Sequence, residues 1–293
     1  MDAIGACDDE LVTVQVIINP LPNTGTANNP APFCENDPAL NNTAFDLFTL
    51  LSPPVDAGGT WTDDDATGAL SGNTLDLSQL VIGTYNFTYS ITDANSCFNS
   101  TTVTLVIDDA PESGTVNGTA AFCEGEAPSN YDLFVLLDNE DQTGTWYLGT
   151  DNTGTAIVNP IDLSGYTAAT YDFTFDVDAI GACDDELVTV QVTINPLPNT
   201  GTPTPAVFCE NDLAANSPLD LFNQLSGNDI GGTWTDDDAT GALTGNTVDL
   251  TRLTLGAYNF TYSITDANNC SNSSTVVITV EDAPSAGTVN ATP

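Results

Sequence analysis

The stretch Gly83-Thr-Tyr-Asn-Phe-Thr-Tyr-Ser-Ile-Thr-Asp-Ala-Asn-Ser-Cys97 decides the fold of this 293-residue chain. Apolar residues alternate in it with polar ones, as in a strand with one buried face: Tyr85, Phe87, Tyr89 and Ile91. Nearly the same sequence returns at Gly256 to Cys270, and a weaker version runs from Ala169 to Asp178, ahead of Cys183. The chain therefore repeats one unit several times.

Gly-Thr pairs at Gly25, Gly114, Gly201 and Gly287 set the register of these units. Each unit contains Phe-Cys-Glu, Asp-Leu-Phe, Gly-Thr-Trp, the Tyr-rich strand, a second Cys and a closing β-branched strand. Proline-bearing junctions follow the closing strands, where a residue without an N–H ends a ladder of hydrogen bonds. We expect three full repeats, at residues 23–111, 112–198 and 199–284. Residues 1–22 are expected to be the C-terminal strands of a truncated preceding repeat, and residues 285–293 the start of a following one.

Residues 2–22 match residues 178–198 at every position except Ile17, which corresponds to Thr193. The first and third full repeats are closer to each other than to the middle one. The repeats therefore alternate between two types, and the chain is expected to be a window from a longer array.

The charge is extreme, with 41 acidic residues against one basic residue and no His, giving a net charge of −40. A chain with this charge repels nucleic acid and anionic lipid surfaces and is not expected to bind them. It stays soluble and attracts divalent cations. No apolar run approaches the roughly 20 residues that cross a bilayer, so direct membrane insertion is not expected.

Six of the seven cysteines fall into pairs when the repeats are aligned, and the members of each pair are about 60 residues apart. A disulfide that closes a loop of this length would stabilise the folded repeat by roughly 4 kcal/mol. One disulfide within each repeat is the economical interpretation, and it indicates an oxidising compartment. Two thiolates per repeat without His are too few for a zinc site. The expected pairs are Cys34–Cys97, Cys123–Cys183 and Cys209–Cys270, with Cys7 unpaired in this fragment.

Short strands separated by Gly, Asn, Asp and Pro predict an all-β chain, a tandem array of immunoglobulin-like β-sandwich repeats of about 87 residues. Trp61, Trp146 and Trp234 resemble the buried Trp of the central strand in such domains. Tyr85 and Tyr258 resemble the tyrosine whose hydroxyl bonds back to the backbone at a sandwich corner. The segment Phe45–Leu51, with its two counterparts, fits either a short strand or a helical turn capped by Asp46.

Catalysis is not expected, and no catalytic residue is assigned. Without His or Lys the chain offers no Ser-His or Cys-His pair and no Schiff-base lysine. Carboxylate pairs would suffice for a glycosidase, but no pattern selects one among so many acidic residues.

Calcium is the candidate cofactor, although none is required. Three consecutive Asp residues follow the Trp strand in two repeats, and Ca²⁺ takes six to eight oxygen ligands of this kind. The alternative interpretation is a set of solvated turns, since no run matches a known calcium-loop spacing. The candidate ligands are Asp63, Asp64, Asp65, Asp236, Asp237, Asp238, Asp93, Asp266, Asp108 and Asp109.

Phe-Cys-Glu-Asn-Asp, Gly-Thr-Trp, Gly-Thr-Tyr-Asn-Phe-Thr-Tyr and the closing Thr-Val-Thr strands together resemble the tandem immunoglobulin-like repeats of giant Bacteroidota cell-surface adhesins, including the flavobacterial gliding-motility type. The resemblance implies an extracellular filament at the cell surface, exported by the type IX secretion system. It would act as a stalk and mechanical tether, with neighbouring repeats of the same chain as partners.

Two other functions stay open at this stage. One is a module that binds surface glycans, the substratum or a protein partner through the loops of each sandwich. The other is self-assembly of the repeats into a surface filament.

Overall fold

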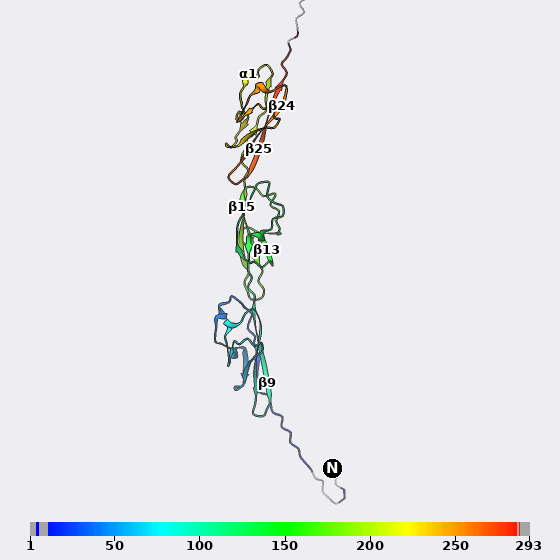
Figure 1. Ribbon diagram of the computed structural model, residues 1–293. Helices are drawn as coiled ribbons and strands as arrows, with labels where there is room; N and C mark the ends of the chain where they lie inside the picture. Colours follow the sequence, from blue (N-terminus) through cyan, green and yellow to red (C-terminus); the bar gives the residue numbers. More distant parts are fainter. Residues whose placement is uncertain (1–3, 6–10, 286, 288–293) are drawn as a thin grey trace, which may run out of the picture. The chain divides into compact units, whose positions relative to one another are not determined.

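The chain forms an all-β structure of small sheets, seen here in a computed structural model that describes residues 4–5, 11–285 and 287 (Figure 1). Its contacts divide it into two compact units. The first contains Met1–Ser113, Asp141–Gly144 and Asp176–Glu186, and the second contains Gly114–Glu140, Thr145–Phe175 and Leu187–Pro293. Among the described residues, no helix has the length and apolarity needed to cross a membrane.

The first unit contains a four-stranded sheet built around the stretch that recurs along the sequence. Its strand order is β2-β9-β8-β5, in which β2 runs parallel to β9 and the other neighbours are antiparallel. β8 and β9 pair over their length, from Gly83 opposite Ile107 to Thr92 opposite Phe98. The strands are β2 (Phe33–Cys34), β5 (Thr60–Asp63), β8 (Gly83–Thr92) and β9 (Phe98–Asp108).

A second layer of short elements covers one face of this sheet. It consists of the β1-β4 pair and the three-stranded sheet β3-β7-β6. The elements are β1 (Thr24–Ala27), β3 (Phe45–Asp46), β4 (Leu51–Val55), β6 (Leu70–Ser71), β7 (Thr74–Leu75) and the 3₁₀ turns η1 (Pro38–Asn41), η2 (Leu47–Leu50) and η3 (Leu77–Gln79).

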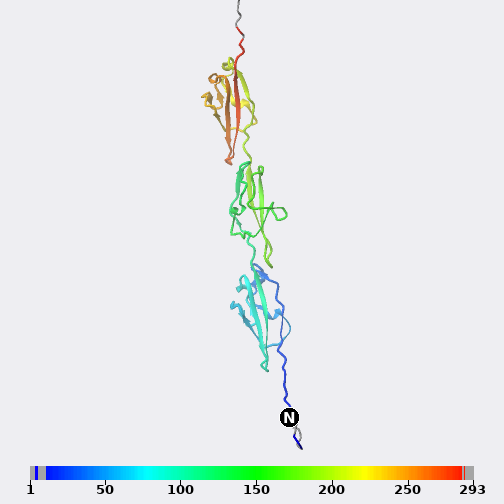
Figure 2. The ribbon, with the colours of Figure 1, turned by 90° about the vertical axis from the view of Figure 1, so that its right-hand side faces the viewer.

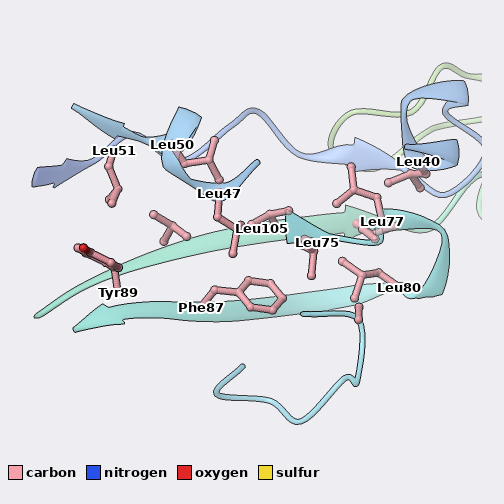
Figure 3. Packing of buried hydrophobic residues seen from close by; sticks show 13 residues of the cluster. Leu40, Leu47, Leu50, Leu51, Leu75, Leu77, Leu80, Phe87, Tyr89 and Leu105 are labelled. Atoms are coloured by element: carbon pink, nitrogen blue, oxygen red, sulfur yellow. The ribbon is translucent and has the colours of Figure 1, made fainter. Parts of the chain in front are cut away.

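The core lies between these two layers. Phe87 and Leu105 point from β8 and β9 toward the layer that carries Leu47 and Leu75 (Figure 3), and all four side chains are fully buried. The alternation of apolar and polar residues is therefore confirmed: the apolar face of the long hairpin is the inner face of a sandwich.

The second unit contains the corresponding elements of the last repeat and most of those of the middle repeat. The last repeat has the sheet order β18-β25-β24-β21, the counterpart of β2-β9-β8-β5. Figure 2 shows its two long strands, in orange and red, side by side. Its elements are β17 (Thr202–Pro203), β18 (Ala206–Cys209), α1 (Leu213–Asn216), β19 (Leu219–Asp220), η5 (Leu221–Gln224), β20 (Leu225–Ser226), β21 (Thr233–Asp236), β22 (Leu243–Thr244), β23 (Thr247–Val248), η6 (Leu250–Arg252), β24 (Gly256–Thr265) and β25 (Ser271–Glu281).

The middle repeat carries one further strand, β14, beside β13, so its main sheet is β11-β16-β15-β13-β14. A short pair, β10-β12, accompanies this sheet. Its elements are β10 (Thr115–Val116), β11 (Ala120–Cys123), η4 (Leu133–Leu136), β12 (Leu137–Asp138), β13 (Gly144–Leu148), β14 (Thr155–Ile157), β15 (Ala169–Val177) and β16 (Glu186–Asn195).

The Asp-Leu-Phe segments form helical turns, which resolves the two alternatives left by the sequence. In the first repeat the Asp46 carboxylate accepts a hydrogen bond from the Phe48 N–H at 3.0 Å and thereby caps η2. Asp132 and Asp220 cap the equivalent turns η4 and η5.

The tyrosine corner is also confirmed. The Tyr85 hydroxyl donates to the Val81 carbonyl at 3.0 Å, and Tyr258 donates to Thr254 at 2.9 Å. Tyr171 makes the same bond to Thr167 in the middle repeat. This feature and the two-layer packing identify the fold as an immunoglobulin-like β-sandwich.

The expected position of the tryptophans is wrong for two of the three. Trp61 and Trp234 lie on β5 and β21, which are edge strands, and both are half-buried. Trp146 alone is buried, at 3% exposure, since β14 pairs with its strand on the outer side.

Residues 11–22, predicted to be strands of a truncated repeat, form no strand. A hairpin without a partner layer cannot bury its apolar face. The domain limits at residues 22, 111, 198 and 284 stay predictions.

Candidate functional site at the cysteine pairs

Two disulfide bonds join the repeats to one another. Cys34 bonds Cys183 with a Cα–Cα distance of 4.9 Å, and Cys123 bonds Cys270 with a Cα–Cα distance of 5.5 Å. Each bond lies inside one of the two compact units. We call the cysteine of Phe-Cys-Glu the front cysteine (Cys34, Cys123, Cys209) and the cysteine just before the closing strand the tip cysteine (Cys97, Cys183, Cys270). In both bonds, the front cysteine of one repeat meets the tip cysteine of the following repeat.

The predicted pairs Cys34–Cys97, Cys123–Cys183 and Cys209–Cys270 are therefore wrong. The physical reason is the register of the first strand against the closing strand. Cys34 lies opposite Asp108, the last residue of β9, whereas Cys97 immediately precedes Phe98, the first. An eleven-residue strand spans roughly 35 Å, and a disulfide needs Cα atoms within about 7 Å.

The same separation occurs in the other two repeats. Cys123 lies opposite Asn195 at the far end of β16 from Cys183. Cys209 lies opposite Glu281 at the far end of β25 from Cys270. The front and tip cysteines thus mark opposite ends of every sandwich.

Backbone contacts hold Cys183 beside Cys34 within the first unit. The Ala182 N–H donates to the Asp108 carboxylate at 2.9 Å. Gly181 has a φ of +75°, and a Cβ at this position would overlap that carboxylate. The Ser113 N–H donates to the Glu186 carboxylate at 2.7 Å. Gly181 was missed from the sequence, because its need for glycine arises from a contact with a residue of the previous repeat.

Two of the predicted calcium ligands, Asp93 and Asp266, cap the turns at the hairpin tips. The Asp266 carboxylate accepts from the Asn268 and Cys270 N–H groups, both at 2.9 Å. Asp93 accepts from Asn95 and Cys97 in the same way, both at 2.8 Å. These turns fix the position of the tip cysteine.

Cys97 and Cys209 form no disulfide, and both are half-buried. Cys7, predicted to be unpaired, lies outside the described residues.

The consecutive aspartates do not converge in the first repeat. Asp63 accepts from the Thr67 hydroxyl and the Gly68 N–H, at 2.8 and 2.9 Å. Asp64 accepts from the Thr88 hydroxyl at 2.6 Å, and Asp65 accepts from the Asn86 N–H at 2.6 Å. Each carboxylate therefore stabilises a different part of the turn and its neighbouring strand.

Asp236, Asp237 and Asp238 repeat this arrangement in the last repeat. Burial raises the pKa of Asp63 and of Asp236, but hydrogen bonds from the turn outweigh it, so the pKa of each lies below the ordinary value.

The structure brings no three acidic or cysteine side chains together as a metal site within its described residues. Asp108 bonds Ala182, and Asp109 is exposed at the junction. The calcium ligands expected from the sequence are not tested by this arrangement.

An open groove beside the edge tryptophan recurs in the first and last repeats. In the first repeat it has a volume of about 590 Å³ and is lined by Phe48, Trp61, Leu70 and Asn73, among others. Its counterpart, of about 560 Å³, is lined by Phe222, Trp234, Leu243 and Asn246, among others.

No protein-family model and no curated protein matches the chain. Among solved structures, the EC1–3 segment of mouse protocadherin-24 is 12% identical and covers 92% of this chain and 100% of that chain, with a TM-score of 0.29. The titin I-band fragment I67–I69 is 13% identical, covers 76% and 88%, and has a TM-score of 0.37. The insect immune protein hemolin is 12% identical, covers 67% and 56%, and has a TM-score of 0.30. Similarities this distant do not inform function.

Proposed function

We propose that this chain is a segment of an extracellular tether in which disulfide bonds carry force from one immunoglobulin-like repeat to the next. The observation that carries the proposal is the order of the two bonds along the sequence: Cys34, Cys123, Cys183 and Cys270 interleave. When the ends are pulled, the shortest covalent path therefore crosses both disulfides.

The middle repeat is then loaded between Cys123 and Cys183. Cys123 ends β11, whose four residues pair in parallel with the last part of β16, from Ala120 opposite Val192 to Cys123 opposite Asn195. Cys183 precedes the other end of β16. The force runs along these strands, so it loads all the hydrogen bonds between them at once instead of one after another.

Charge and redox chemistry support a place outside the cell. Persistent disulfides are typical of oxidising compartments. With 41 acidic residues and one basic residue, neighbouring repeats repel one another, which opposes collapse and aggregation. The finer assignment, an adhesin of a bacterial surface used in attachment or gliding and exported by type IX secretion, is supported by the sequence resemblance alone.

Single-molecule pulling tests the tether role. In the oxidised chain only about 60 residues between Cys123 and Cys183 can extend, which is roughly 200 Å of contour. After reduction, about 240 residues between Cys34 and Cys270 become free to extend, roughly 800 Å. We expect a gain of several hundred ångström on adding a reductant.

The matched control is the Cys97→Ser Cys209→Ser variant, which keeps both bonds and should show the same gain. Equal contour lengths in the oxidised and reduced chains would contradict the proposal.

Glycan binding is the second candidate, favoured by the paired grooves at Trp61 and Trp234. Each groove is lined by aromatic side chains and one Asn, and this mixture suits a sugar, which offers an apolar face and hydroxyl groups. In the middle repeat the corresponding Trp146 is buried. A glycan array probed with the whole chain tests this function, and capture of no glycan above background would remove it.

A further inference from the structure

Both bonds obey one rule: a front cysteine bonds the tip cysteine of the next repeat. Applied to every cysteine of the three full repeats, the rule leaves one front cysteine and one tip cysteine without a partner. These are Cys209 and Cys97, the two free thiols among the described residues.

Cys209 is held in the same backbone setting as the bonded front cysteines. It lies opposite Glu281, and the next N–H, that of Glu210, donates to the Glu281 carbonyl at 3.0 Å. In the bonded cases, Cys34 lies opposite Asp108 with Glu35 donating to the Asp108 carbonyl at 3.0 Å, and Cys123 lies opposite Asn195 with Glu124 donating to the Asn195 carbonyl at 2.9 Å.

Cys97 is likewise held in the setting of a bonded tip cysteine. Its turn is capped by Asp93 and includes Ser96 with a φ of 66°. The turn of Cys270 is capped by Asp266 and includes Asn269 with a φ of 64°. Because Cys270 is bonded and Cys97 is not, the turn does not depend on the disulfide for its shape.

We propose that Cys209 and Cys97 are bonding sites for further repeats of this kind. Cys209 takes the tip cysteine of a following repeat, and Cys97 takes the front cysteine of a preceding one. The two bonded pairs each join repeats of different type, so the partner in both cases is a repeat that resembles residues 112–198.

The chemistry is a two-electron oxidation. Two thiols lose two protons and two electrons to form the S–S bond, and a small-molecule disulfide such as oxidised glutathione accepts them and leaves as two thiols. The inference depends on the two observed bonds and not on the tether role.

The test adds a repeat to the whole chain. A second copy of residues 112–198 follows Pro284, which corresponds to Pro111, and the protein is refolded in oxidised and reduced glutathione. Alkylation without reduction, followed by peptide mass spectrometry, maps every cysteine. We expect Cys209 to be labelled in the original chain, and to be protected and linked to the added copy of Cys183 in the extended one.

A second extension places residues 112–177 before Asp2, which completes a repeat because residues 2–22 match residues 178–198. Cys97 should then link to the added copy of Cys123.

Formation of Cys34–Cys183 and Cys123–Cys270 in the same samples reports correct folding. If these two bonds form while Cys209 or Cys97 stays free, or links within its own repeat, the inference is overturned. Replacing the added Cys183 by Ser should return Cys209 to full labelling. Pulling experiments are not involved, so failure here is distinguishable from failure of the tether role.

Discussion

Cys34 lies opposite Asp108 in the parallel pairing of β2 with β9, and this pairing determines which disulfide can form. It places the front cysteine at the end of the sandwich remote from its own tip cysteine. A repeat with this register cannot close its own disulfide, and both of its cysteines are directed to other repeats. The covalent connection between repeats therefore follows from a strand register within one repeat.

Removing an inter-repeat bond should destabilise the chain. The Cys34–Cys183 bond closes a loop with a sequence separation of 149. By lowering the conformational entropy of the unfolded chain, a bond of this kind stabilises the folded chain by about 5 kcal/mol. We expect the Cys34→Ser Cys183→Ser variant to unfold at a clearly lower urea concentration, measured by tryptophan fluorescence.

The control for this measurement is Cys97→Ser, which removes a free thiol and should stay within about 0.5 kcal/mol of the unchanged chain. Equal behaviour of the two variants would show that the bond contributes nothing to stability.

Replacing Gly181 should impair formation of the bond itself. Alanine is strained at a φ of +75°, and its methyl group would overlap the Asp108 carboxylate. We expect Gly181→Ala to lower the yield of Cys34–Cys183 after refolding and to leave Cys123–Cys270 intact, as measured by mass spectrometry of unreduced peptides.

Gly118→Ala is the matched control, since a Cβ there meets nothing within 4 Å and its φ is not positive. A full yield of Cys34–Cys183 in Gly181→Ala would contradict the role assigned to this glycine.

Much of the fold could be predicted from the sequence, because alternation and corner motifs depend on neighbours along the chain. The burial of Phe87 and the hydrogen bond of Tyr85 follow from such local patterns. The pairing of Cys34 could not be predicted in this way. It depends on β2 running parallel to the end of β9, a contact between residues more than 70 positions apart that spacing alone does not encode.

Acid should weaken the turns that follow the Trp strands. The pKa of Asp63 in the folded chain lies below its ordinary value of 3.8, where hydrogen bonds from Thr67 and Gly68 outweigh the opposing effect of burial. At Asp63 the unfolded chain therefore binds a proton more readily than the folded chain does. The stability that the ionised carboxylate gives the folded chain is complete above pH 3.8, and it is lost as the pH falls through the folded-state pKa.

We expect Asp63→Asn to cost about 1 kcal/mol at pH 7, because a neutral amide accepts the hydrogen bonds from Thr67 and Gly68 less strongly than the carboxylate does. The difference from the unchanged chain should shrink as Asp63 becomes protonated, in urea melts at pH 7 and at pH 2. A deficit that is the same at both would show that the charge of Asp63 does not matter.

Calcium removal is the sharpest test of the acidic loops. The carboxylates of Asp63, Asp64 and Asp65 each accept hydrogen bonds from separate groups, so a cation that gathered them would first have to break those bonds. We therefore expect the melting temperature in millimolar Ca²⁺ to equal that in EDTA once ionic strength is matched with NaCl. Matching is essential, because a chain of net charge −40 gains stability from any screening cation.

A rise of several degrees with Ca²⁺ but not with Mg²⁺ would instead show a specific site. Its abolition in Asp64→Asn Asp237→Asn, with Asp109→Asn unchanged, would place that site in the loops and not at the junctions.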